Sequence, residues 1–188
     1  SVIHNLGTLS ILNNSLNASS LNSNVATIGA EKNSVLSLKN ISVVSENTDN
    51  KSSICNKGKL EVKNSYIKGP YGIGCNDEAG AEINVQDSKI VATKHNGVQF
   101  NVTENITGGT ISSTKISGND TAIVFASAGV LNVESGIFIG ATGNSIANYN
   151  SGTINIHQSN KSVYISSLAQ DWNPACLLYT SPSPRDRT

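Results

Sequence analysis

The feature that most constrains the fold is a short pattern that recurs about seven times along the chain. Its clearest copy is 58–67, where a glycine is followed by alternating apolar and polar residues, then by two polar residues and two more apolar ones. Alternation with a period of two is typical of a β-strand with one buried face. Asn64 and Ser65 favour a turn after that strand, because their side chains can hydrogen-bond to the nearby backbone.

The copies align on one apolar anchor in each unit. The anchors are 22 to 27 residues apart, and they are Ile11, Leu38, Val62, Val85, Ile111, Val133 and Ile156. A second, mostly apolar column lies two residues earlier: Leu9, Leu36, Leu60, Ile83, Gly109, Leu131 and Ile154. A third lies five residues after the anchor: Leu16, Val43, Ile67, Ile90, Ile116, Phe138 and Lys161. A further apolar position follows each corner: Val25, Ile54, Ile73, Val98, Ile123 and Ile146.

One column is polar in all seven units. It lies two residues after the anchor, and its members are Asn13, Asn40, Asn64, Asp87, Ser113, Ser135 and Gln158. We expect these side chains to form a structural ladder at a corner of the fold, where buried amides satisfy one another and the turn backbone.

Repeats of this length are typical of a solenoid, a propeller or an array. A propeller blade needs about forty residues, and a leucine-rich repeat needs a helical half, whereas no helical periodicity of useful length is present. We therefore predict an all-β, right-handed parallel β-helix solenoid of about seven rungs of 22–27 residues, with no helices of note. The hand follows from the rule for parallel crossovers.

The stacked rungs should bury a continuous apolar column, because one rung cannot bury its own apolar face. Gly109 is expected to leave a thin spot in that core, filled by Ile106 or Ile111. Cys55 and Cys75 are separated by about one rung, so they could stack. Two packed thiols are favoured over a disulfide, because the parallel geometry suits a bridge poorly; whether they are bridged stays open.

Composition excludes some partners. The formal charge is zero and charged residues make up 14% of the chain, whereas a nucleic-acid partner needs a basic stripe. No apolar run is long enough to span a bilayer. We expect no cofactor.

Few residues offer chemistry. Asp87 and Glu61 could approach each other across rungs as a carboxylate pair, but no arginine or histidine motif accompanies them, and His95 is expected to be exposed beside a turn. The acidic turn formed by 76–78 with Glu82 has too few ligands for calcium. We therefore predict no catalytic residue and no metal site. Tyr66 and Tyr71, which share a rung, are candidate ligand-binding residues that can stack on sugar rings; the alternative is that they cover loop edges.

Several units share a short motif in which glycine precedes a run ending in valine or isoleucine, seen at 58–62, 108–111, 129–133 and 152–156. They resemble the repeats of adhesin-like surface β-helix proteins of bacteria, which have a pectate-lyase-like fold, over about residues 1–165. The resemblance implies a non-catalytic, extracellular module on the cell surface or cell wall, acting as a stalk or as a binder of host glycan or surface protein. The alternative is a fragment of a polysaccharide lyase or glycoside hydrolase whose catalytic rungs lie outside this segment. The oligomeric state stays open.

The C-terminal residues break every column. Residues 176–186 resemble the translated read-through of a sequencing adaptor, and the only arginines, Arg185 and Arg187, lie within 176–188. We expect 1–175 to be a β-helix repeat segment, internal to a longer protein, and 176–188 to be a non-native, disordered tail.

Overall fold

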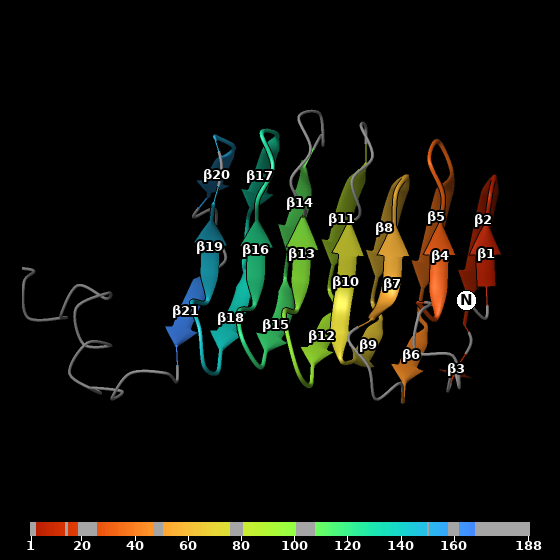
Figure 1. The fold of residues 1–188 in the computed structure, drawn as a ribbon, viewed down its shortest axis with the longest axis horizontal. Helices are drawn as coiled ribbons and strands as arrows, with labels where there is room; N and C mark the ends of the chain where they lie inside the picture. The colour runs from red at the N-terminus through yellow and green to blue at the C-terminus, as the bar shows by residue number, and fades with distance from the viewer. Residues whose placement is uncertain are drawn as a thin grey trace, which may run out of the picture.

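The chain forms three parallel β-sheets around one core, as the computed structural model shows (Figure 1). The structure describes residues 3–13, 15–18, 26–46, 51–75, 81–100, 108–149, 151–157 and 162–167. Within these ranges it contains strands and turns but no helix. The predicted all-β parallel solenoid is therefore confirmed.

Each sheet contains seven strands, one from each turn of the coil. Sheet A consists of β1 (Ile3–Asn5), β4 (Ile28–Ala30), β7 (Ser52–Asn56), β10 (Tyr71–Cys75), β13 (Val98–Phe100), β16 (Ile123–Phe125) and β19 (Ile146–Asn148). Sheet B consists of β2 (Thr8–Leu12), β5 (Val35–Lys39), β8 (Lys59–Lys63), β11 (Glu82–Gln86), β14 (Gly108–Ser112), β17 (Val130–Val133) and β20 (Thr153–Ile156). Sheet C consists of β3 (Ser15–Ala18), β6 (Ser42–Ser45), β9 (Tyr66–Gly69), β12 (Lys89–Ala92), β15 (Thr114–Gly118), β18 (Gly136–Gly140) and β21 (Val163–Ser167).

The path of the chain makes the coil right-handed. In Figure 1 the strands of sheet A run upward at the front, and those of sheet B run downward behind them. The chain meanwhile advances from red at the right to blue at the left. A coil that rises at the front, descends behind and advances to the left is right-handed, as is usual for parallel crossovers.

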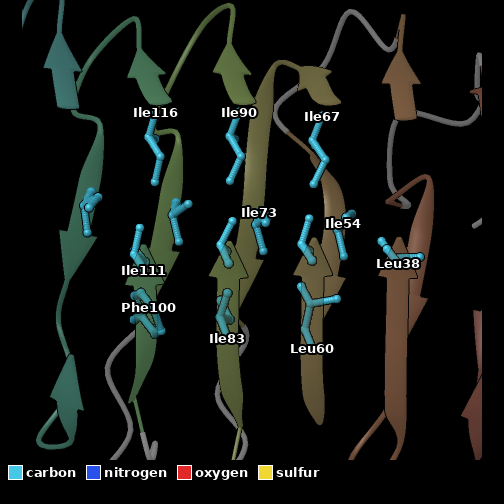
Figure 2. Packing of buried hydrophobic residues seen from close by; sticks show 14 of the residues in the cluster. Leu38, Ile54, Leu60, Ile67, Ile73, Ile83, Ile90, Phe100, Ile111 and Ile116 are labelled. Atoms are coloured by element: carbon cyan, nitrogen blue, oxygen red, sulfur yellow. The ribbon is translucent and has the colours of Figure 1, made fainter. Parts of the chain in front are cut away.

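The strand register reproduces the apolar columns of the sequence. Val62 pairs with Leu38 on one side and with Val85 on the other. Leu60 and Ile83 are likewise direct neighbours, and all five of these side chains lie in the buried core. Figure 2 shows that inward side chains from all three sheets meet in this core. Apolar side chains stack in this way because each rung covers the open face of the next.

Five turns, from β4 to β18, enclose a sealed core, whereas the two terminal turns are partly open. Leu9 and Ile11 of the first turn are only half-buried. In the last turn Ile156 is 47% exposed and Ile165 is 51% exposed. The prediction of about seven equivalent rungs is therefore slightly too high, because a terminal rung has a neighbour on one side only.

Two members of the predicted columns are wrong. Phe138 pairs with Ile165, not with Lys161, which lies outside the described residues. Ile28, not Val25, is the neighbour of Ile54; Val25 also lies outside the described residues. Both errors arise where the connection between strands is longer than in the other turns, so that counting from the anchor no longer finds the next inward position.

The B-to-C corner is a single residue in the left-handed conformation. The residues with positive φ there are Asn13, Asn40, Asn64, Asp87 and Ser113, with φ between 46° and 53°. Asparagine and aspartate tolerate this region better than other residues that have a Cβ. The backbone N–H of each of the first four donates to a carbonyl of the following turn, at 3.0 to 3.1 Å. The corner is thus set by residue type and held by the neighbouring rung.

A buried row of hydroxyls follows this corner, one residue later in three successive turns. The Ser65, Ser88 and Thr114 hydroxyls each donate to the carbonyl oxygen two residues earlier, at 2.7 to 2.8 Å. Each also accepts a backbone N–H from the preceding turn, at 3.1 to 3.4 Å. These contacts satisfy backbone groups that would otherwise be unpaired in a dry interior.

Gly109 is not the thin spot that the sequence predicts. It pairs with Ile83 and Leu131, and a Cβ placed on it would collide with the carbonyl oxygen of Ile83. Close approach of two backbones therefore explains the glycine. Ile111 occupies its own position in the anchor column, and Ile106 lies outside the described residues.

Cys55 and Cys75 do not occupy equivalent positions. Cys55 pairs with Gly74, and Cys75 pairs with Asn56. The two cysteines are offset from each other by one residue in the strand register. Stacked thiols are therefore ruled out by the register.

Candidate functional site

An open groove runs along the B-to-C corner and has a volume of about 790 Å³. It extends over several turns, from Asn40 at one end to Ile137 at the other. It follows the solenoid axis, because its lining residues come from equivalent positions of successive turns.

Most turns along the groove contribute the same three consecutive positions: the corner residue, the next residue, and the first outward residue of sheet C. The triplets are Asn40–Ile41–Ser42, Asn64–Ser65–Tyr66, Asp87–Ser88–Lys89 and Ser113–Thr114–Lys115, with Gly136–Ile137 from the next turn. The middle position is buried in the first four triplets, and the outer two are exposed or half-buried. Equivalent groups therefore recur at about the 4.8 Å spacing of neighbouring strands.

The corner side chains form one edge of the groove. The Asn40 amide nitrogen donates to Asn13 Oδ1 at 2.8 Å, and the Asn64 amide nitrogen donates to Asn40 Oδ1 at 2.7 Å. Farther along, the Ser113 N–H donates to Ser135 Oγ at 2.8 Å. The three asparagine side chains are exposed rather than buried, contrary to expectation. Each exposed amide has more donors and acceptors than its hydrogen bonds along the row use, so the remaining ones can bind a ligand.

The other edge is the first outward column of sheet C. Tyr66 pairs with Ser42 on one side and with Lys89 on the other, and Lys115 follows Lys89. The Lys89 ammonium lies 5.5 Å from the centre of the half-buried Tyr66 ring. This distance is within the range of a cation–π contact. The groove thus combines an aromatic ring with two exposed cations.

Tyr71 does not share this groove. It lies on β10 of sheet A, and its ring stacks on the His95 imidazole with 4.3 Å between ring centres and 18° between planes. His95 Nδ1 lies 3.2 Å from Asp120 Oδ2, and Thr142 Oγ1 lies 3.2 Å from Asp120 Oδ1. Burial raises the pKa of Tyr71, and the Asp120 carboxylate raises it further. The two candidate ligand-binding tyrosines, Tyr66 and Tyr71, therefore belong to one repeat unit but lie on different sheets.

The expectation that His95 is exposed is wrong, because its side chain is only 26% exposed. The contacts of this cluster join successive turns at the C-to-A corner, which connects each sheet C strand to the next strand of sheet A. Sequence reasoning missed it, since Tyr71, His95 and Asp120 are about one turn apart and no local motif links them. The signal that was available is their similar offset from the anchors Val62, Val85 and Ile111, which is nine or ten residues.

Glu61 and Asp87 line different hollows. A second groove, of about 350 Å³, lies on the outer face of sheet B and is lined by Glu61, Asn84 and Glu134 among others. Ser37 Oγ donates to Glu61 Oε2 at 3.2 Å, whereas Asp87 lines the corner groove. The structure does not bring these two carboxylates into one site.

The acidic turn predicted at 76–78 lies outside the described residues, and Glu82 accepts a hydrogen bond from the Asn84 amide at 2.7 Å. Among the residues that the structure describes, no group of three or more histidine, cysteine, aspartate or glutamate side chains is placed to hold a metal ion. None of the described residues forms a helix of the length and hydrophobicity that crossing a bilayer requires.

Comparisons with models of protein families, with curated proteins and with solved structures each find no match. The class of protein is therefore defined by the fold alone, as a parallel β-solenoid built from sequence repeats.

Proposed function

We propose that this chain is a non-catalytic binding module whose corner groove holds an extended glycan. The observation that carries the proposal is the repetition of polar triplets along the groove, from Asn40 to Lys115. A ligand that makes the same contacts in successive turns must itself repeat along its length. A linear polysaccharide has this property, and its hydroxyls match the amide and hydroxyl groups of the groove.

Tyr66 supports a sugar ligand, since a half-buried ring at the groove edge offers an apolar face beside polar groups. Aromatic side chains with one apolar and one polar side are well suited to such surfaces. In keeping with the resemblance of its repeats, the module is proposed to act outside the cell, at the surface of a bacterium, as a stalk or adhesin-like segment. Its partner would be a host glycan or a glycosylated surface protein.

The test is binding of the chain to a panel of immobilised neutral and acidic polysaccharides. Tyr66→Ala should weaken binding by about ten-fold, since an aromatic anchor contributes on the order of 1–2 kcal/mol. The matched control is Tyr164→Ala, which removes a 57% exposed tyrosine from the same outward column but outside the groove.

Loss of binding in both variants, or in neither, would contradict the assignment of the groove. Release of shortened or unsaturated sugar products during incubation would instead favour the polysaccharide-processing alternative. No binding to any glycan by the unaltered chain would refute the proposal as a whole.

A further inference from the structure

The outer face of sheet C carries positive charge only. Its outward positions with described side chains include three lysines and neither an aspartate nor a glutamate; the lysines are Lys68, Lys89 and Lys115. The chain as a whole has a formal charge of zero. Sheet B by contrast carries charges of both signs, with Lys59, Glu61 and Lys63 on β8 and Glu82 on β11.

Two of these lysines are direct neighbours. Lys89 and Lys115 pair across β12 and β15, so both ammonium groups leave the same side of the sheet one strand apart. Like charges placed directly opposite one another in neighbouring strands destabilise a sheet. Folding stability therefore does not explain the pair.

Among the described residues, no carboxylate lies within ion-pair distance of either lysine. The contact of Lys89 is with the Tyr66 ring. Both line the corner groove, where Asp87 is the single carboxylate among the lining residues. The edge of the groove formed by Lys89 and Lys115 is therefore positively charged and suited to an anionic ligand.

Building on the glycan-binding function proposed above, we propose that the corner groove selects acidic polysaccharides, whose carboxylate or sulfate groups lie on Lys89 and Lys115 while a sugar ring packs near Tyr66. Each ammonium offers three donors to an anionic oxygen, and charge complementarity provides selectivity more than affinity. A nucleic acid fits less well, because the chain as a whole is neutral and the groove contains only one aromatic ring.

Titration calorimetry tests this with three soluble oligosaccharides of equal length: a uronic acid oligomer, the same oligomer with its carboxyls reduced to alcohols, and a sulfated oligomer. The unaltered chain should bind the acidic oligomers more tightly than the neutral one, and raised salt should weaken only the acidic ones. The uronate and sulfate arms show which anionic group the groove prefers.

The test variant is the double substitution Lys89→Gln with Lys115→Gln. It should weaken acidic binding by about ten-fold, the range expected for two exposed ion pairs, and leave neutral binding unchanged. The matched control is Lys32→Gln with Lys59→Gln, which removes the same charge from exposed positions outside the groove. Circular dichroism verifies that both variants keep the sheet.

The outcomes separate the two proposals. Equal affinity for neutral and acidic oligomers, unaffected by the double substitution, would overturn the selectivity but leave glycan binding intact. Binding of none of the three would overturn both. Tight binding of a single-stranded oligonucleotide without binding of the acidic oligomers would also overturn this inference, in favour of a nucleic-acid ligand.

Discussion

The core assignment makes its sharpest prediction at Val62, which is fully buried and stacks between Leu38 and Val85. In Val62→Asp the burial of the valine is lost, which costs about 1.5–3 kcal/mol. An unpaired polar group in the same place costs about 1–3 kcal/mol more even when it is protonated. We therefore expect a loss of about 2.5–6 kcal/mol, a large part of the stability of an ordinary domain.

The matched control is Val35→Asp, the same substitution on the same sheet. Val35 is 40% exposed, and its strand neighbour is Lys59. An exposed substitution of this kind changes stability by about 0.5 kcal/mol or less. Urea denaturation of both variants, followed by circular dichroism, measures the difference. Equal midpoints for the two would refute the inward assignment of the anchor column.

The pH dependence of Val62→Asp provides a second check. Burial raises the pKa of a carboxyl in the folded state above its unfolded value, which is about 3.9. The unfolded chain then releases its proton first as pH rises, so the deficit of the variant should widen from about pH 4 upward and narrow below it. A deficit that is independent of pH would mean that the new carboxylate reaches solvent.

Three further predictions concern the backbone and the tyrosine cluster. Gly109→Ala should cost about 1–3 kcal/mol, because its Cβ meets the neighbouring strand's carbonyl oxygen. Gly7→Ala, with no atom near its Cβ position, should leave stability unchanged or raise it slightly, because alanine restricts the unfolded chain; urea midpoints compare the two variants. Asn64→Ala should cost about 1–2 kcal/mol, because it removes an amide hydrogen bond and a residue suited to positive φ. Asn64→Gly should cost less, because glycine also tolerates positive φ. Thermal melts distinguish the two variants. The phenol of Tyr71 should titrate above its ordinary pKa of 10.0, and its pKa should fall in Asp120→Asn. The stability that the protonated phenol contributes is therefore present below about pH 10 and lost above it. Ultraviolet titration measures the pKa, and thermal melts at several pH values measure the stability.

The inward half of this protein could be predicted from the sequence because burial restricts residue type. A side chain in the dry core of a rung must be apolar, so Leu36, Leu60 and Ile83 recur at fixed offsets and show the strand pairing before any coordinates. The corner was also readable, because few residues other than asparagine and aspartate tolerate its positive φ. The count of residues from the anchor failed where a longer connection shifts it, as before Ile28 and Ile165.

The outward half was decided by the tertiary structure. Water tolerates almost any polar side chain, so residue type on that side carries little information about position. Lys89 and Lys115 each precede a member of the third apolar column, so the alignment of the units already makes them neighbours. Only the tertiary structure shows that they lie along an open groove. Likewise, only the tertiary structure shows that Tyr71, His95 and Asp120 meet. The sequence by itself therefore determined the solenoid and its core, because burial selects residues one position at a time. The surface sites depended on which turns the coil brings together.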